Sequence, residues 1–63
     1  MTNKTTNKWI PVKKESPDKP GQYLVTVYDW TIDYKYVRLG NYYIGGYWES
    51  PMITAWMPLP DPY

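Results

Sequence analysis

The chain has 63 residues, a formal net charge of +1, and neither cysteine nor histidine. This length supports one domain at most, the lack of cysteine excludes a disulfide framework, and the lack of both residue types excludes the usual zinc sites. No stretch is apolar enough for a signal peptide or a membrane span, so we expect a cytoplasmic protein without membrane contact, metal or cofactor.

Aromatic side chains are the main resource for a core. The chain carries 4 Trp and 8 Tyr but no Phe, and each buried aromatic side chain removes roughly 150 to 250 Å² of surface from water. A domain of this size buries only about 60% of the surface that its unfolded chain exposes. We therefore expect marginal stability and a homodimer that buries additional surface.

The first part of the chain predicts a tail followed by a short extended segment. Residues 1–8 are polar and predict a disordered tail, which leaves 9–63 as a single small β domain. Ile10 stands before Pro11, and a residue before proline favours an extended backbone. The stretch "KKESPDKPG" over 13–21 concentrates turn-forming residues and predicts a loop.

The middle of the chain predicts strands joined by turns. "QYLVTVY", between Gly21 and Asp29, is dense in β-branched and aromatic residues. A bulge is expected at Gly40 and Asn41, and Gly45 with Gly46 fits a tight hairpin turn. The expected strands are 22–28, 34–39 with a continuation over 41–44, 47–49 and 53–56. No window has a helical period, so the sequence predicts an all-β fold, a small antiparallel meander of three to four strands with extended, proline-rich flanking segments.

Alternation along these strands assigns the side chains to two faces. We expect Val25 and Val27 to face the core together with Val37 and Leu39, because successive side chains of a strand point to opposite faces. Tryptophans from the flanking segments are expected to complete this core. The expected core residues are Trp9, Val25, Val27, Val37, Leu39, Trp48 and Trp56.

The other face collects tyrosines and an arginine, and the following loop holds a tryptophan. Tyr, Trp and Arg are enriched at binding hot spots because they combine a large rigid contact area with a polar end. We therefore expect a partner-binding surface here, while the alternative that these rings only stabilise the sheet as cross-strand pairs stays open. The candidate binding residues are Tyr28, Trp30, Tyr34, Tyr36 and Arg38.

The C-terminal "TAWMPLPDPY" over 54–63 is expected to be the closing structural element of the domain. Its prolines lack the three-residue spacing that places them on one side of a polyproline helix, which argues against a ligand for another domain. We expect Trp56 to pack against the sheet near Trp9.

Catalysis has little support in the sequence. Without His or Cys the chain lacks the most common general base and the activated thiol, and Ser16 and Ser50 stand beside prolines with no base to activate them. None of the 6 carboxylates lies in an apolar strand where desolvation would shift its pKa. We therefore expect a protein that is not an enzyme.

Two ends of the chain carry a family resemblance. "WIPV" over 9–12, "ESPDKPGQYLVTVY" over 15–28 and "TAWMPLPDP" over 54–62 resemble a small domain-of-unknown-function family common in phages and prophages. Its members open with W-I-P-V or similar and close on T-H-W-M-P-L-P-x-P. The usual leucine before the first loop proline is Ser16 here, and the usual histidine is Ala55, so no role of that histidine carries over. The resemblance implies a phage origin and a compact β domain without an assigned enzymatic activity.

These observations lead to one expected function and two alternatives. We expect a small phage-encoded, non-enzymatic binding protein of the host cytoplasm that inhibits a host antiviral defence protein or enzyme by direct binding. One alternative is a nucleic-acid-binding accessory protein, since residues 1–20 hold five lysines against two acidic residues, although the near-neutral whole makes nucleic acid a less favoured partner. The other is a domain that sequesters a nucleotide on its aromatic side chains near Lys35 and Arg38. The lysines of the first alternative are Lys8, Lys13, Lys14 and Lys19.

Overall fold

The structure, a computed structural model, describes residues 8–62, and all of their regular secondary structure is β. The strands are β1 (Ile10–Pro11), β2 (Gly21–Asp29), β3 (Tyr34–Tyr43), β4 (Tyr47–Trp48) and β5 (Ile53–Met57). They form one antiparallel sheet in the order β1-β5-β2-β3-β4. The predicted all-β antiparallel fold is confirmed, and the short extended segment before the first loop pairs with β5 as an edge strand. The tail predicted for 1–8 lies outside the described residues except for Lys8.

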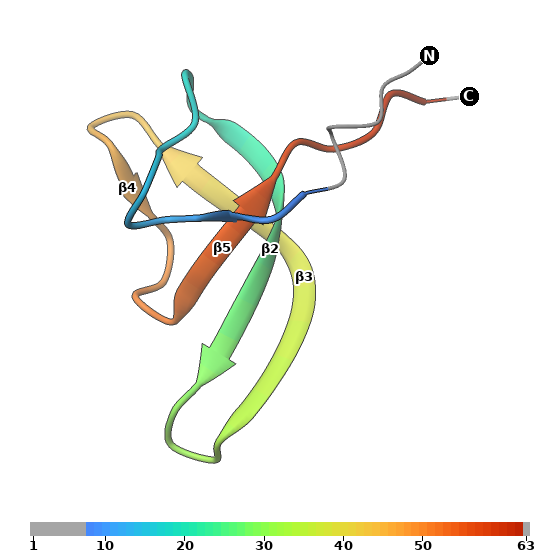
Figure 1. The fold of residues 1–63 in the computed structure, drawn as a ribbon. Helices are drawn as coiled ribbons and strands as arrows, with labels where there is room; N and C mark the ends of the chain where they lie inside the picture. The colour runs from blue at the N-terminus through green and yellow to red at the C-terminus, as the bar shows by residue number, and fades with distance from the viewer. Residues whose placement is uncertain (1–7, 63) are drawn as a thin grey trace.

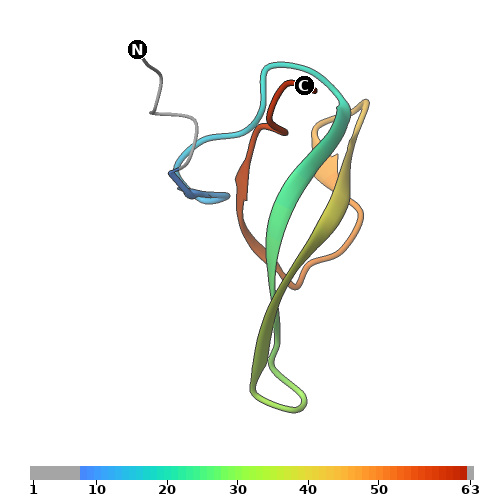
Figure 2. The same ribbon diagram turned by 90° about the vertical axis from the view of Figure 1, so that its right-hand side faces the viewer.

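The sheet curls into an open half-barrel, and one hairpin projects from it (Figure 1). β2 and β3 have 9 and 10 residues, whereas β5 pairs with β2 only between Leu24 and Val27. The far end of the β2–β3 hairpin therefore extends past the rest of the sheet, as Figure 2 shows, and the longest dimension of the molecule is 40 Å against 26 and 23 Å. Within residues 8–62 no helix is long and apolar enough to cross a bilayer.

The core lies on the inner face of the curl. Four buried side chains form it, and five partly buried hydrophobic residues pack against them. The buried residues are Val25, Val27, Ile53 and Trp56, and the surrounding ones are Ile10, Val12, Tyr23, Trp48 and Met52. Val25, Val27 and Trp56 are thus buried as the sequence predicts, and Trp48 contributes from the rim.

Trp56 joins the C-terminal segment to the loop after β1. Its indole N–H donates a hydrogen bond to the carbonyl of Glu15 at 2.9 Å, and its ring meets that of Tyr23 edge to face at 5.2 Å. This hydrogen bond satisfies the one donor of the indole, as the burial of a Trp side chain requires. Of the segment expected to close the domain, 54–63, residues 54–57 belong to β5, while 58–62 are exposed and lack regular secondary structure.

The prediction that Val37 and Leu39 belong to the core is wrong. Val25 lies opposite Arg38 and Val27 opposite Tyr36, so the residues of β3 that share the inner face are the even-numbered ones. Val37 and Leu39 lie on the outer face and are 57% and 48% exposed. Both faces of β3 carry large side chains, so alternation alone does not say which face turns inward.

Gly40 decides the orientation of β3. It is buried, and a Cβ built on it would lie 2.8 Å from Cγ2 of Val25, so this inner-face position has room only for glycine. The bulge expected at Gly40 and Asn41 is absent, because the register between β2 and β3 runs unbroken past both residues. The predicted turn at Gly45 and Gly46 is confirmed, with φ angles of +103° and +85° that favour glycine.

The prediction that Trp9 belongs to the core is also wrong. Its side chain is 39% exposed. Ile10 lies opposite Trp56 and packs against the core, and adjacent residues of an extended chain point to opposite sides. Ile10 therefore takes the inward position that the sequence reasoning gave to its larger neighbour.

Candidate functional site

The five candidate binding residues do not form one continuous surface. Tyr34, Tyr36 and Arg38 lie on the inner face of β3, beyond and beside the core. Tyr28 is on the outer face of β2, because it follows the inward-facing Val27. Trp30 is in the loop that joins the two strands. The prediction placed Tyr28 with the other tyrosines because it assigned β3 the opposite orientation.

The loop at the end of the β2–β3 hairpin is fixed by its own polar groups. One carboxylate oxygen of Asp29 accepts hydrogen bonds from the backbone N–H of Thr31 at 3.0 Å and from the Thr31 hydroxyl. The backbone N–H of Ile32 donates to the carbonyl of Asp29 at 3.3 Å. Asp33 has φ +53°, in the left-handed region that Asp tolerates better than most residues. The loop therefore has a defined shape without help from the rest of the sheet.

Asp33 also binds a side chain on the outer face of the hairpin, that of Tyr28. Its carboxylate accepts a hydrogen bond of 2.7 Å from the hydroxyl of Tyr28. This bond stabilises the protonated phenol and raises the pKa of Tyr28 above its ordinary value. With the polar groups of the turn paired among themselves, the apolar side chains of Trp30 and Ile32 are left in solvent, 55% and 66% exposed.

Tyr34 and Tyr36, on the inner face of β3 just after the loop, are also exposed. Their rings stack with centroids 5.9 Å apart and planes at 27°. The pairing of β5 with β2 ends at Val27, which lies opposite Tyr36, so Tyr34 lies beyond the end of β5. The two rings are exposed, as are those of the pair Tyr43 and Tyr47, whereas the rings of Tyr23 and Trp48 pack against the core.

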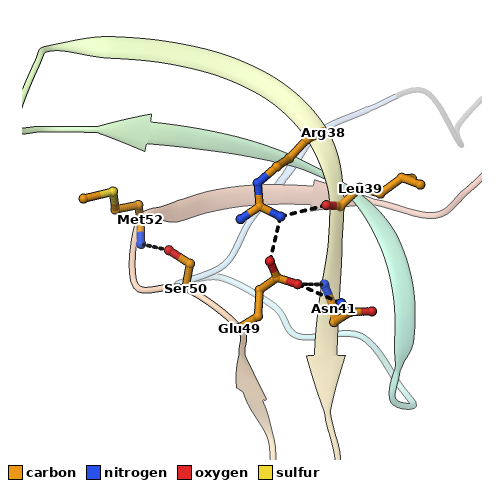
Figure 3. Close-up of polar contacts among 6 residues, drawn as sticks. All are labelled: Arg38, Leu39, Asn41, Glu49, Ser50 and Met52. Carbon is orange, nitrogen blue, oxygen red and sulfur yellow. Dashed lines mark hydrogen bonds and ion pairs between the residues drawn. The ribbon is translucent and has the colours of Figure 1, made fainter.

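Arg38 is engaged with the protein itself (Figure 3). Its Nη1 atom donates hydrogen bonds to Oε2 of Glu49 at 2.7 Å and to the carbonyl of Leu39 at 2.8 Å. Oε1 of Glu49 accepts from the backbone N–H and the side-chain amide of Asn41, both at 2.8 Å. The bond from Arg38, followed by the bond from the Asn41 backbone, lowers the pKa of Glu49, and Glu49 in turn raises the pKa of Arg38.

This network has a structural role at the edge of β3. The side chains of Arg38 and Glu49 satisfy backbone groups of Leu39 and Asn41 that point away from β2, where β4 no longer runs. In the segment between β4 and β5, the hydroxyl of Ser50 accepts a hydrogen bond from the backbone N–H of Met52 at 3.1 Å (Figure 3). Sequence reasoning missed this role because Glu49 is separated from Arg38 by eleven positions and the strand register brings them together.

The outer face holds an apolar row that the sequence reasoning did not identify. Leu24 lies between Met57 on one side and Leu39 on the other, and Val37 follows on the same face. Leu39 and Val37 are exposed, while Leu24 and Met57 are half-buried. The alternation of apolar residues along β3 predicts a row at Val37 and Leu39, but these two residues were assigned to the core.

No residue cluster within 8–62 combines three or more His, Cys, Asp or Glu in reach of a metal ion, and no cavity was found in the same part of the chain. The lysines of the nucleic-acid alternative, Lys8, Lys13, Lys14 and Lys19, are all exposed. Comparisons with protein-family models, curated proteins and solved structures found no match. The resemblance to the phage family therefore stays a prediction.

Proposed function

We propose that the chain is a non-enzymatic protein-binding module whose binding element is the projecting end of the β2–β3 hairpin. The observation that supports this is the gathering of Trp30, Ile32 and Tyr34, each more than half exposed, at the end of a hairpin that extends past the sheet. Large apolar side chains left in solvent next to one another are typical of interaction sites. Trp and Tyr are also the commonest hot-spot residues.

The hairpin end is organised before any partner arrives. The bonds within the turn hold Asp29, Thr31 and Ile32 in one arrangement, and Tyr28 is tied to Asp33 across it. A surface that is already ordered loses less conformational entropy on association, which leaves more of the contact free energy for affinity. This is the property expected of a binding element.

The charge at the hairpin end favours a protein partner over a nucleic acid. Asp29 and Asp33 flank the exposed Trp30 and Ile32, and Lys35 is the one basic residue close to them in sequence. A phosphate backbone is repelled by carboxylates, whereas an apolar pocket with basic residues at its rim complements this arrangement. We infer a protein with such a pocket as the partner.

A more specific proposal rests on the resemblance of the two ends of the chain to phage-encoded domains. It makes the partner a component of a host antiviral defence system and the action an occupation of its surface in the host cytoplasm. The support is the motif pair at 9–12 and 54–62, joined to the exposed hairpin end. Trp56, the best-buried residue of the second motif, serves the fold, so the motif itself is not the binding element.

The test compares Trp30→Ala with Trp9→Ala, since both tryptophans are exposed and only Trp30 is on the hairpin end. Tagged wild-type protein should recover a host protein that mass spectrometry identifies, and expression should restore phage plating on a defended host. Trp30→Ala should lose both effects at unchanged Tm, while Trp9→Ala keeps both. Recovery of no host protein together with unchanged plating would contradict the proposal. Equal loss of partner recovery and plating in the two variants would show that the binding site is not the hairpin end.

The exposed lysines support a second candidate, a nucleic-acid-binding accessory protein. Lys13, Lys14 and Lys19 are exposed in the loop between β1 and β2. Phosphate contacts make affinity fall steeply with salt, so single-stranded or duplex DNA and RNA are titrated at low and at moderate ionic strength. Binding that vanishes with salt and with Lys13→Gln and Lys14→Gln supports this candidate, and a flat titration in low salt removes it.

A further inference from the structure

Among residues 8–62, one edge of β3 has no neighbouring strand over much of its length. β3 pairs with β2 from Tyr34 to Tyr42 on one side, but on the other side β4 pairs with Tyr42 and Tyr43 alone. Within the part of the chain that the structure describes, only β2 runs beside the lower part of β3 (Figures 1 and 2). An edge of this kind presents a row of backbone donors and acceptors that another strand can use.

The hydrogen bonds of the sheet identify which groups face this edge. The carbonyl of Asn41 accepts the backbone N–H of Glu49 at 3.0 Å, so Asn41 points away from β2. Backbone direction alternates along an antiparallel strand, so Leu39, Val37 and Lys35 point the same way.

Side chains already occupy the upper part of the edge. Glu49 accepts the N–H of Asn41, and Arg38 donates to the carbonyl of Leu39. For Lys35 and Val37, within residues 8–62, no backbone hydrogen bond outside the β2 ladder is found. The free part of the edge is therefore short and clearly bounded.

We propose that this edge pairs with the same edge of a second copy of the chain, antiparallel and about a two-fold axis beside Tyr36, so that two sheets become one. In this register Lys35 of each copy lies opposite Val37 of the other. Both residues direct their N–H and C=O groups outward, so each of these two pairs exchanges both of its hydrogen bonds. Tyr36 lies opposite Tyr36 of the second copy as a pair without backbone hydrogen bonds.

Neighbouring registers are disfavoured by groups seen in the structure. Placing Val37 opposite itself brings Leu39 opposite Lys35, but the Leu39 carbonyl is held by Arg38. Placing Lys35 opposite itself sets two like charges directly across the strands, which destabilises a sheet. The register centred on Tyr36 avoids both conflicts.

The side chains explain why a second copy fits this edge. In the proposed register the ring of Tyr34 lies beside the guanidinium of Arg38 of the second copy, an arrangement that a cation and a tyrosine face favour. The two Tyr36 rings meet on the inner face, and the aliphatic part of Lys35 covers Val37 on the outer face. The exposed Tyr34, Tyr36 and Val37 thus gain cover from their own counterparts, as a self-complementary two-fold interface requires.

Tyr34 belongs both to the proposed binding element and to this interface, whereas Trp30 and Ile32 belong to the binding element alone. The proposed backbone pairs involve residues 34–38, and Trp30 and Ile32 lie in the turn before them, so neither residue takes part in the pairing of the two strands. Trp30→Ala should therefore leave the mass in solution unchanged, and loss of partner binding would leave the dimer intact.

Cross-linking tests the register directly, because the chain has no cysteine of its own. Cα atoms of a pair without backbone hydrogen bonds are about 4.5 Å apart, within the range that a disulfide bridges. Tyr36→Cys should form a covalent dimer with oxidised glutathione as oxidant, seen on a non-reducing gel. Tyr34→Cys is the matched control on the same face. Its counterpart is displaced by four residues, roughly 13 Å along the strand, so it should stay monomeric on that gel.

Light scattering in the micromolar range completes the test. The wild type should show twice the monomer mass. Val37→Pro removes the outward N–H and should give the monomer mass with an unchanged circular dichroism spectrum, while Val37→Ala keeps the N–H and the dimer. A wild type of monomer mass overturns the proposal, as does a Val37→Pro variant that folds and stays dimeric. Cross-linking of Tyr34→Cys as readily as Tyr36→Cys also overturns it, and this cysteine pair decides alone if Val37→Pro unfolds.

Discussion

The substitution Gly40→Ala tests the tightest packing contact of the sheet. Gly40 is buried on the inner face of β3, against the fully buried Val25. An added Cβ would lie 2.8 and 3.0 Å from the two γ-methyl carbons of Val25 and 3.4 Å from Cδ1 of Ile53. Real Cβ atoms essentially never come within 3.0 Å of another heavy atom, so Val25 or the β3 backbone must move.

The expected loss follows from two opposing effects. Overpacking a close-packed core costs about 1 to 3 kcal/mol. Replacing glycine by alanine also restricts the unfolded chain, which stabilises the protein by roughly 0.4 to 1 kcal/mol. Because the added methyl would clash with both γ-methyls of Val25, whose side chain is 0% exposed, we expect the free energy of unfolding to fall by about 2 kcal/mol. At roughly 4 to 8 °C per kcal/mol for a domain of this size, Tm should fall by about 8 to 16 °C.

Urea unfolding followed by tryptophan fluorescence measures this change, with thermal circular dichroism for Tm. The control is the same substitution in a Val25→Ala background, which lacks the two γ-methyls that would clash with the added Cβ. There Gly40→Ala should cost less than about 0.5 kcal/mol, since the two sites are in contact and couple. A stability gain for Gly40→Ala in the wild-type background would refute the inward orientation of Gly40 and with it the orientation of β3.

Three further predictions test the core, the acid response and the outer face. Trp56→Ala should cost about 3 to 5 kcal/mol and leave the domain largely unfolded by circular dichroism; a folded variant would contradict the structural role of Trp56. The pKa of Glu49 is lowered in the folded state, so its charge contributes stability that is complete above the unfolded pKa, about 4.3, and is lost as pH falls through the folded pKa. The urea midpoint of the wild type should therefore drop more steeply in acid than that of Glu49→Gln, and parallel curves would disprove the link. Val37→Thr should change stability by less than about 0.5 kcal/mol, whereas Val27→Thr, which buries a hydroxyl, should cost about 1 to 3 kcal/mol. Equal losses for the two variants would reverse the assignment of the faces.

Local signals in the sequence were sufficient for the strands and for part of the core. The β-branched run around Val25 and Val27 and the glycine pair before β4 act over a few neighbouring residues, and both are found as predicted. Pairing between β1 and β5 joins residues such as Ile10 and Trp56, far apart in the sequence. No local pattern contains that information.

The orientation of β3 shows why alternation fails when both faces are large. Tyr36 and Val37 are each apolar enough to face a core, and the outcome depends on Gly40 meeting Val25 from another strand. The candidate surface has the same origin. Trp30 and Tyr34 were identified by residue type, but Ile32 was missed. An isoleucine between polar residues in a turn has no neighbour to cover it, and that was the available signal.

The hydrogen bond from Trp56 to Glu15, which spans 41 positions, sets a condition on biosynthesis. Half of the buried core, Ile53 and Trp56, comes from the last strand, so a ribosome must release those residues before the inner face of β2 can be covered. Until then a nascent chain exposes Val25 and Val27, and a fold built on contacts so distant in sequence forms slowly, on the scale of milliseconds to seconds. Synthesis of this protein therefore passes through an aggregation-prone stage that ends only when β5 has emerged.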